Sequence, residues 1–380
     1  MLDFSALTVI DNHCHPYIVR TEPDRYHALD SFLGFPGSDP QTVNHRAGMV
    51  YQAWAVRQIA GFLRCDPKPE EIALVRSEET DEEAYVTRLF EDGRIEALVV
   101  DTGYPQPPID MTAFRALTPV PLAPIFRIEP AIHSMLKARL TYDEMVRRYD
   151  EGIRRAIRDE GYRGLKSIIA YRTGLDVDLA HAGEAAGRRG LDQALAEPER
   201  MIASKPLRNH LLLRALELSI ELGVPFQIHT GFGDADIVLA RCNPALLNEM
   251  LKEEPYRQAR VVLIHCYPFL AEASWMAAAL PNVWLDLSLG IPFAPVAADR
   301  IIGTALELAP ITRILHGSDA FAGPEQVWLG AQLTKVALGR VMTDLVSKDL
   351  LTETNAYEAA AAILSNNARL LYAHHSAPLA

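Results

Sequence analysis

The chain has 380 residues, of which 49% are hydrophobic, and it carries a formal net charge of −12. A chain of this length and apolar content can bury one large core. The negative charge argues against nucleic acid as a partner, because contacts to phosphates need clustered lysine and arginine. The sequence contains no apolar run long enough to span a bilayer, so we expect no membrane partner.

Four cysteines are scattered along the chain without the spacing of a disulfide framework: Cys14, Cys65, Cys242 and Cys266. This usage indicates a reducing compartment and no structural disulfides. The N-terminus lacks a basic region followed by an apolar stretch and a small-residue cleavage site, so we expect no signal peptide. Together these features predict a globular protein of the cytoplasm.

Eight short apolar runs, rich in β-branched residues and bounded by turn residues, predict strands. In chain order they cover residues 7–13, 95–103, 122–129, 163–171, 225–231, 261–267, 283–289 and 313–319. Apolar residues at helical spacing predict helices over 141–162, 209–223, 271–282 and 324–342. We expect Thr141 to cap the first of these helices and Gly223 to end the second.

Eight strands that alternate with helices predict a closed parallel (β/α)8 TIM barrel of the α/β class. The alternative, an open doubly wound sheet, usually carries a glycine-rich phosphate loop after its first strand, whereas here that strand ends in HCHP. We interpret residues 1–375 as one barrel domain. Within it we expect a helical insertion over 20–94 and a long loop over 174–192, and after it a disordered tail over 376–380.

Two histidines, His13 and His15, lie one residue apart at the end of the first predicted strand. Alternate residues on a strand point to the same face, so this pair can chelate one ion. Three further strand ends carry His229, His265 and Asp319, and in a barrel these ends converge on the face that holds active sites. A single histidine is more often a hydrogen-bonded core or surface residue. Five such residues on four strands nevertheless indicate a metal site of the Zn²⁺ type.

Lys166 lies within a strand that we expect to be buried, where a bare ammonium is costly to desolvate. Two interpretations stay open for this residue. In one, the lysine pairs with a carboxylate such as Glu129. In the other, it reacts with CO2 to form a carbamate, an anionic oxygen ligand that is able to bridge two metals.

The order of these residues resembles the amidohydrolase superfamily of metal-dependent hydrolases: HxH on the first strand, Lys on the fourth, His on the fifth and sixth, Asp on the eighth. The phrases IDNHCHP, GLKSIIAYRTGL, FQIHTGFGD and HGSDAF resemble its amidohydrolase-2 branch. Within that branch they are most similar to the domain fused to glutamine-synthetase-like modules in fungal and plant nodulin-type proteins. The resemblance covers nearly the whole chain.

The resemblance implies one or two divalent ions, with Zn²⁺ expected, and the ligands His13, His15, Lys166, His229, His265 and Asp319. In the two-metal form, the HxH pair and the aspartate hold the first ion. A carbamylated lysine then bridges to a second ion on the remaining two histidines. In single-metal members the strand-five histidine joins the first site and the strand-six histidine polarises substrate. The presence of the lysine favours two metals.

The expected chemistry follows from the ion, since a bound Zn²⁺ lowers the pKa of its water to about 7 and makes hydroxide available to attack a carbonyl carbon. Asp319 is then placed to accept a proton from the water and pass it to the leaving amine, with His265 as the next candidate for this role. By strand alternation Cys14 should point away from the metal. We interpret Cys14, Cys266 and His316 as packing residues.

Four residues at the same expected rim are candidates for substrate binding. Arg127 and Glu129 end the third predicted strand, while Tyr171 and Arg172 follow the fourth. An arginine at this rim could hold a substrate carboxylate through two hydrogen bonds. A structural ion pair of either arginine with Glu129 or Asp101 is an equally good interpretation.

These observations predict a metal-dependent hydrolase that cleaves an amide or similar C–N bond of a small polar molecule. Analogy with the fused family suggests a γ-glutamyl amide. The first alternative is nonoxidative decarboxylation of a small acid by the same metal site, and the second is a non-catalytic barrel kept for interaction. Five convergent ligands argue against the second. The expected partners are a small-molecule substrate and further copies of the chain in a homo-oligomer.

Overall fold

The computed structural model describes residues 1–17, 45, 47–105 and 107–373. Eight parallel strands form one sheet in the order β1 to β8. They are β1 Val9–Cys14, β2 Ile95–Asp101, β3 Leu122–Arg127, β4 Gly164–Ser167, β5 Phe226–His229, β6 Val261–Ile264, β7 Val283–Asp286 and β8 Ile314–Leu315. Each strand lies within or close to a run that the sequence predicts, and most end earlier because the chain turns into the loops of the site.

The sheet closes where the chain after β8 meets β1. The backbone N–H of Asn12 donates to the carbonyl of His316 at 2.9 Å, and the N–H of Asp319 donates to the carbonyl of His13 at 2.8 Å. The predicted TIM barrel is therefore confirmed. In this closure the loop that carries Asp319 is bonded directly to the strand that carries His13.

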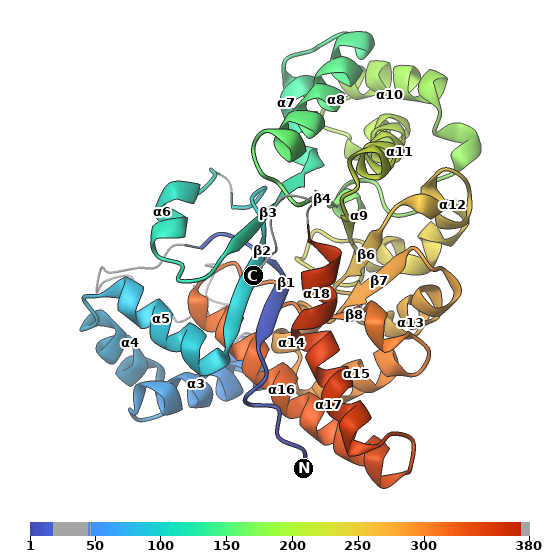
Figure 1. The fold of residues 1–380 in the computed structure, drawn as a ribbon. Coiled ribbons are helices and arrows are strands. Elements are labelled where there is room, and N and C mark those ends of the chain that lie inside the picture. The colour runs from blue at the N-terminus through green and yellow to red at the C-terminus, as the bar shows by residue number, and fades with distance from the viewer. Residues whose placement is uncertain (18–44, 46, 106, 374–380) are drawn as a thin grey trace.

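Helices lie outside the sheet and connect its strands (Figure 1). In the first half of the described chain they are α3 Val50–Leu63, α4 Pro69–Ser77, α5 Glu82–Gly93, α6 Met111–Ala116, α7 Ile128–Lys137, α8 Tyr142–Arg158, α9 Ile169–Arg172 and α10 Glu184–Ala196. In the second half they are α11 Lys205–Leu222, α12 Asn248–Lys252, α13 Leu270–Ala279, α14 Gly290–Phe293, α15 Ala298–Leu306, α16 Pro324–Ser347, α17 Glu353–Ala361 and α18 Asn367–Leu371. None of the helices in the described residues combines the length and apolar character needed to cross a membrane.

Three of these helices, α3, α4 and α5, lie between β1 and β2, in the segment 20–94 that we interpret as an insertion. They group on one side of the barrel, away from α7, α8, α10 and α11 (Figure 1). Residues 20–44 and 46 of this region lie outside the described residues, as does the expected tail over 376–380. The division into domains therefore stays a prediction.

One expectation is wrong, because the segment 174–192 is not simply a long loop. Its second part forms α10, which continues to Ala196. The glycines that suggested a loop allow close helix packing instead: a Cβ on Gly190 would lie 2.4 Å from the backbone nitrogen of Leu207, beside the neighbouring helix α11. The predicted caps at Thr141 and Gly223 are present, the second in the left-handed conformation at φ 65°.

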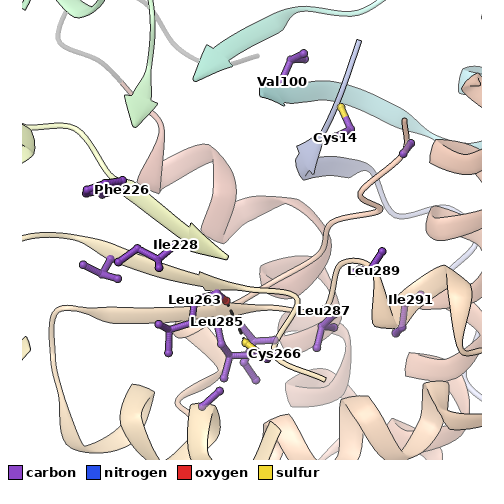
Figure 2. Packing of buried hydrophobic residues seen from close by; sticks show 14 of the residues in the cluster. Cys14, Val100, Phe226, Ile228, Leu263, Cys266, Leu285, Leu287, Leu289 and Ile291 are labelled. Atoms are coloured by element: carbon purple, nitrogen blue, oxygen red, sulfur yellow. Dashed lines mark hydrogen bonds between the residues drawn. The ribbon is translucent and has the colours of Figure 1, made fainter. Parts of the chain in front are cut away.

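Two apolar layers hold the strands in place. The larger layer packs the outside of the sheet against the helices and includes Cys14 beside Val100 and Cys266 beside Leu263 (Figure 2). Both cysteines are buried and lie in this apolar layer, as expected for packing residues. The smaller layer fills the barrel interior with side chains of β1, β2, β3, β6 and β8, and residues of α18 pack against them. The polar residues of the site lie at the C-terminal ends of the strands.

Candidate metal centre

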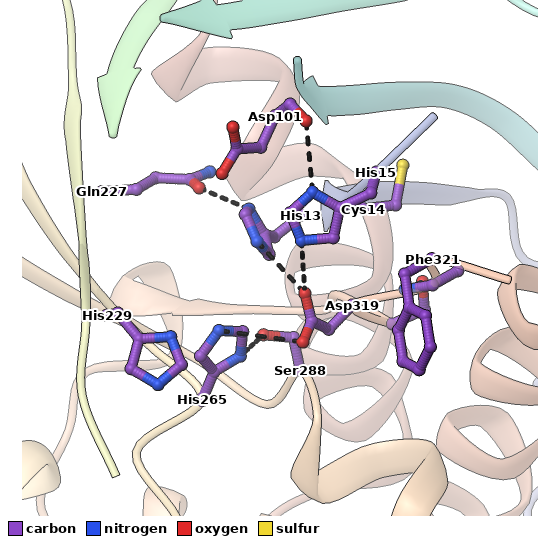
Figure 3. Close-up of polar contacts among 12 residues, drawn as sticks. His13, Cys14, His15, Asp101, Gln227, His229, His265, Ser288, Asp319 and Phe321 are labelled. Atoms are coloured by element: carbon purple, nitrogen blue, oxygen red, sulfur yellow. Dashed lines mark hydrogen bonds and ion pairs between the residues drawn. The ribbon is translucent and has the colours of Figure 1, made fainter. Parts of the chain in front are cut away.

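Three side chains from the ends of β1 and β8 converge inside the barrel (Figure 3). The Nε2 atoms of His13 and His15 each lie 3.2 Å from Oδ1 of Asp319. Nε2 of His265, just after β6, lies 3.9 Å from Oδ2 of the same carboxylate. The ligand atoms of His13, His265 and Asp319 lie within 4.8 Å of one another, close enough to hold one ion.

The tautomers of the first two histidines follow from their outer hydrogen bonds. Nδ1 of His13 lies 2.7 Å from Oε1 of Gln227, whose own amide nitrogen donates to the carbonyl of Asn12. Nδ1 of His15 lies 3.1 Å from the backbone carbonyl of Asp101. Because both partner oxygens can only accept, each Nδ1 carries the proton and each Nε2 presents a lone pair.

The same argument applies to His265. Its Nδ1 lies 2.8 Å from Oγ of Ser288, and that hydroxyl donates its proton to Oδ1 of Asp286 at 2.7 Å. Ser288 therefore accepts from Nδ1, and the Nε2 of His265 faces the cavity with a lone pair. Bonds of this kind orient metal-binding imidazoles in known sites.

These protonation states fit a cation. Burial lowers the pKa of His13 to about 4 and that of His265 well below its ordinary value. Burial by itself raises the pKa of Asp319, but the neighbouring imidazoles, His265 first, hold it well below its ordinary range. Oδ1 of Asp319 is buried and accepts no well-formed hydrogen bond. Nitrogen lone pairs thus face a carboxylate, an arrangement that a divalent ion would stabilise.

The backbone around these ligands is held in unusual conformations by two buried acids. His265 and Asp319 have φ values of 73° and 58°, in the left-handed region that residues other than glycine rarely adopt. Asp286 accepts from the backbone N–H of His265 at 2.7 Å. Asp11 accepts from the backbone N–H groups of Ser318 at 2.9 Å and His13 at 3.1 Å. Each acid therefore positions a ligand-bearing turn.

Three supporting residues are absent from the sequence-based prediction, and each has a weak signal. Asp11 is a charge inside an apolar strand, and Gln227 shares its strand face with His229. Ser288 lies two residues after Asp286, an acid within a predicted strand. The register of β1 shifts between Asp11 and Cys14, so the neighbours Asn12 and His13 both bond inside the barrel. Strict alternation could not show this irregularity.

Lys166 on β4 reaches the edge of the cluster. Its side chain is buried, and Nζ lies 3.4 Å from Nε2 of His13. Glu129 is not its partner, because Oε1 of that residue accepts instead from Ser167 Oγ and the N–H of Ile168. Burial lowers the pKa of Lys166 to about 8, so its neutral amine form is accessible near neutral pH.

His229 lies beside His265, with 4.4 Å between the ring centroids. Its Nε2 lies 3.2 Å from the carbonyl of Phe232, so this nitrogen carries the proton and the lone pair is on Nδ1. Its tautomer differs from that of the other three histidines. His229 lines the cavity, but it is not part of the compact ligand groups of the described residues.

A cavity of about 210 Å³ lies over the ligands and is lined by all six predicted metal ligands together with Arg127, Tyr171 and Arg172. Arg127 forms a two-pronged ion pair with Asp101 at 2.6 and 2.9 Å, so the structural interpretation holds for this arginine. The hydroxyl of Tyr171 accepts from the N–H of Asp234 at 3.1 Å. Arg172 lines the cavity without a hydrogen bond or ion pair among the described residues.

The structure places the fourth substrate candidate elsewhere. β3 ends at Arg127, and Glu129 belongs to the first turn of α7 rather than to the strand. The argument from strand parity therefore fails for Glu129, which lines a neighbouring cavity and not the one over the metal ligands.

Comparisons with known proteins agree with this geometry. The family model described as amidohydrolase matches residues 143–373, and the chain belongs to this family of metal-dependent barrel enzymes. Protein fluG of Emericella nidulans is 34% identical over 249 residues, which make up 62% of this chain and 28% of fluG. The chain thus spans less than a third of this curated relative.

Solved structures extend the likeness to the whole fold. One from Lactobacillus casei ATCC 334, described as a "putative metal-dependent hydrolase", is 28% identical with a TM-score of 0.83, covering 98% of both chains. A uronate isomerase from Thermotoga maritima is 13% identical with a TM-score of 0.65, covering 97% of this chain and 95% of its own. The second likeness shows a shared fold alone.

Proposed function

We propose that this protein is a metal-dependent hydrolase that cleaves an amide C–N bond in a small polar substrate. One observation carries the proposal: imidazole lone pairs of His13 and His15 converge on a buried oxygen of Asp319 that lacks a hydrogen-bond donor. Membership of the amidohydrolase family and the likeness to the Lactobacillus casei structure support it.

The residues of the site have separate tasks in this reaction. A divalent ion, when bound, supplies positive charge that polarises a carbonyl group and acidifies a water molecule, and Zn²⁺ suits these ligands. Asp319 is ionised at neutral pH, so it can accept a proton and return it to the leaving amine. His265 is held by Ser288 with the lone pair of its Nε2 facing the cavity, where it could bind an ion.

We further propose that Lys166 is carbamylated, and the carbamate would offer an anionic oxygen ligand for a second divalent ion. In this step the neutral amine nitrogen attacks the carbon of CO2, a C–N bond forms and one proton is released. The lowered pKa of Lys166 and its place beside His13 support the assignment. His229 and His265 would then complete the second position, provided that the contact of His229 with Phe232 rearranges.

A γ-glutamyl amide is the substrate that we propose within this class. The suggestion rests on the resemblance to domains fused to glutamine-synthetase-like modules. A cavity of about 210 Å³ suits a molecule of this small size, and Arg172 on its wall suits an acidic one.

A second candidate reaction, decarboxylation of a small acid, is favoured by one specific feature. The two compact ligand groups of the described residues, His13 with His265 and Asp319 and His13 with His15 and Asp101, share His13, and His229 belongs to neither. A single ion with an unmodified lysine is the arrangement that we associate with decarboxylation.

The experiment that separates the two candidates combines metal analysis with the native intact mass. Two ions per chain and a CO2 adduct on Lys166 support the hydrolase. The same preparation is then given γ-glutamyl amides and small aromatic acids, with released amine and released CO2 measured separately. Release of CO2 without any amine would contradict the hydrolase.

A further inference from the structure

A second cavity of about 580 Å³ adjoins the cavity over the metal ligands. The two cavities share the lining residues Tyr104, Arg127, Ile168 and Arg172. Residues of α7 and Arg208 of α11 also line the second cavity. The two cavities are therefore neighbours that share one wall.

Arg208 is a buried cation whose charge is only partly offset, by Glu129. The residue is only 6% exposed, and its Nε donates to Oγ of Ser204 at 2.8 Å. Within the described part of the chain, it forms no ion pair and no second hydrogen bond. Burial lowers the pKa of its guanidinium to about 10, which reflects the cost of holding this charge away from water.

The other charged groups on the wall do not cancel it. Arg127 is already neutralised by Asp101. Arg172 contributes a second positive charge that is unpaired among the described residues. Glu129 is the acid that lines this cavity. Its Oε1 accepts from Ser167 and the backbone, and burial raises its pKa while Arg127 and Arg208 act to lower it. Glu129 therefore offsets part of the positive charge, and the two arginines without ion pairs, Arg208 and Arg172, leave the wall positively charged.

We propose that this second cavity binds a carboxylate at the far end of the substrate, held by Arg208 and Arg172. A guanidinium offers two parallel N–H donors to a carboxylate, and the unpaired donors of Arg208 suit this geometry. The inference rests on the proposed function, because it assigns the scissile carbonyl to the metal centre and the free carboxylate to this subsite. The substrate class is then a monoamide of a short dicarboxylic acid, which includes glutamyl amides.

Binding of two matched acids tests the subsite without any turnover. Glutarate and pentanoate have the same number of carbons, but only glutarate carries a second carboxylate. We expect calorimetry on the zinc-loaded protein to give glutarate at least a tenfold lower Kd than pentanoate, since hydrogen bonds between charged groups commonly contribute about ten- to a hundredfold. Arg208→Gln should remove most of this preference and leave pentanoate binding unchanged, because Arg208 lines only the second cavity. Arg172→Gln should also remove most of the preference.

Arg189→Gln is the matched control, since Arg189 is an exposed arginine on the neighbouring helix α10 and should keep the full preference. Unchanged pentanoate binding also shows that Arg208→Gln is folded, and circular dichroism shows it for Arg172→Gln. If Arg208→Gln does not fold, the preference measured for Arg172→Gln tests the subsite. Equal affinity of the wild type for both acids, or a preference that survives both substitutions, would overturn the subsite. Failure to hydrolyse amides alongside a clear glutarate preference would instead count against the proposed reaction alone.

Discussion

Nε2 of His13 lies 3.2 Å from Oδ1 of Asp319, and neither atom has a proton to share. The proton of the imidazole is on Nδ1, where Gln227 accepts it, and the carboxylate is ionised. Two electron-rich atoms this close, in a buried position, are stabilised by a positive charge beside them. The ammonium of Lys166, 3.4 Å from Nε2 of His13, or a divalent ion can supply that charge.

Gln227 should control metal affinity through this orientation. Gln227→Leu removes the acceptor that fixes the tautomer of His13. The imidazole proton is then no longer held on Nδ1 and can move to Nε2, where it competes with the metal. We expect the Kd for Zn²⁺ to rise by about 10–100-fold, the usual effect of removing such a partner. Competition with a zinc-binding dye measures this Kd, with Gln193→Leu, at an exposed position of α10, as control. An unchanged Kd would mean that Gln227 has only a packing role.

Asp319 should be needed for turnover more than for substrate binding. Asp319→Asn keeps the shape of the side chain but cannot accept a proton. General acid–base groups contribute about 10²–10⁴-fold, so we expect turnover to fall at least about a hundredfold with KM little changed. Steady-state kinetics with metal content measured in parallel provide the check. Near-native turnover with bound metal would assign the proton transfer to another group, with His265 first.

Lys166 should be essential, and its function should be recoverable by small acids. Lys166→Ala removes the anchor for the proposed carbamate, and activity should be lost. Acetate or propionate should restore part of it, because a free carboxylate can occupy the bridging position. A high-resolution crystal structure of the metal-loaded protein offers a separate test. A free ammonium at Lys166 in that structure would refute the carbamate.

His316 should make the fold sensitive to acid. It is fully buried, and burial lowers its pKa to about 3. Its Nδ1 donates to Oγ1 of Thr334, whose own proton goes to the carbonyl of Gly330. The unfolded chain binds a proton near pH 6.5 whereas the folded chain does not, so stability is lost as pH falls from about 6.5 towards 3. The contribution of one such group approaches about 1.4 kcal/mol per pH unit.

Urea unfolding of the metal-free protein at pH 7 and pH 5 tests this dependence. His316→Gln should lose less stability than the wild type over that interval, because the substitution removes one of the titrating groups. His181→Gln, at an exposed histidine, should behave as the wild type does. Equal losses for His316→Gln and the wild type would show that His316 is not held neutral in the folded state.

The barrel could be predicted from sequence because its elements are short and strongly patterned. Each strand is an apolar run, and a parallel barrel brings the ends of all strands to one face, so His13, His265 and Asp319 could be placed together. The supporting bonds could not be predicted in the same way. Gln227 and Ser288 form hydrogen bonds to residues on strands that are distant in sequence. Their partners depend on strand register and on backbone turns such as the one at His265, where φ is 73°.

The failures have local physical causes. Glu129 follows β3 by two residues, but a helix begins at Ile128, so strand parity no longer applies to it. Gly187 and Gly190 suggested a loop, yet in α10 they face α11 at close range, where tertiary packing outweighs helix propensity. Arg208 could not be singled out from the sequence, because an arginine is recognised as buried only when the packing of its helix, α11, against the cavity is known.

The central claim is that His13 and His15 bind the same ion. Metal content per chain, measured by mass spectrometry on the wild type and on the double variant His13→Ala/His15→Ala, tests it most directly, with His181→Ala as a control that should retain metal. We predict at least one divalent ion per chain in the wild type and a folded double variant that has lost it. Full metal occupancy in that variant would contradict the account.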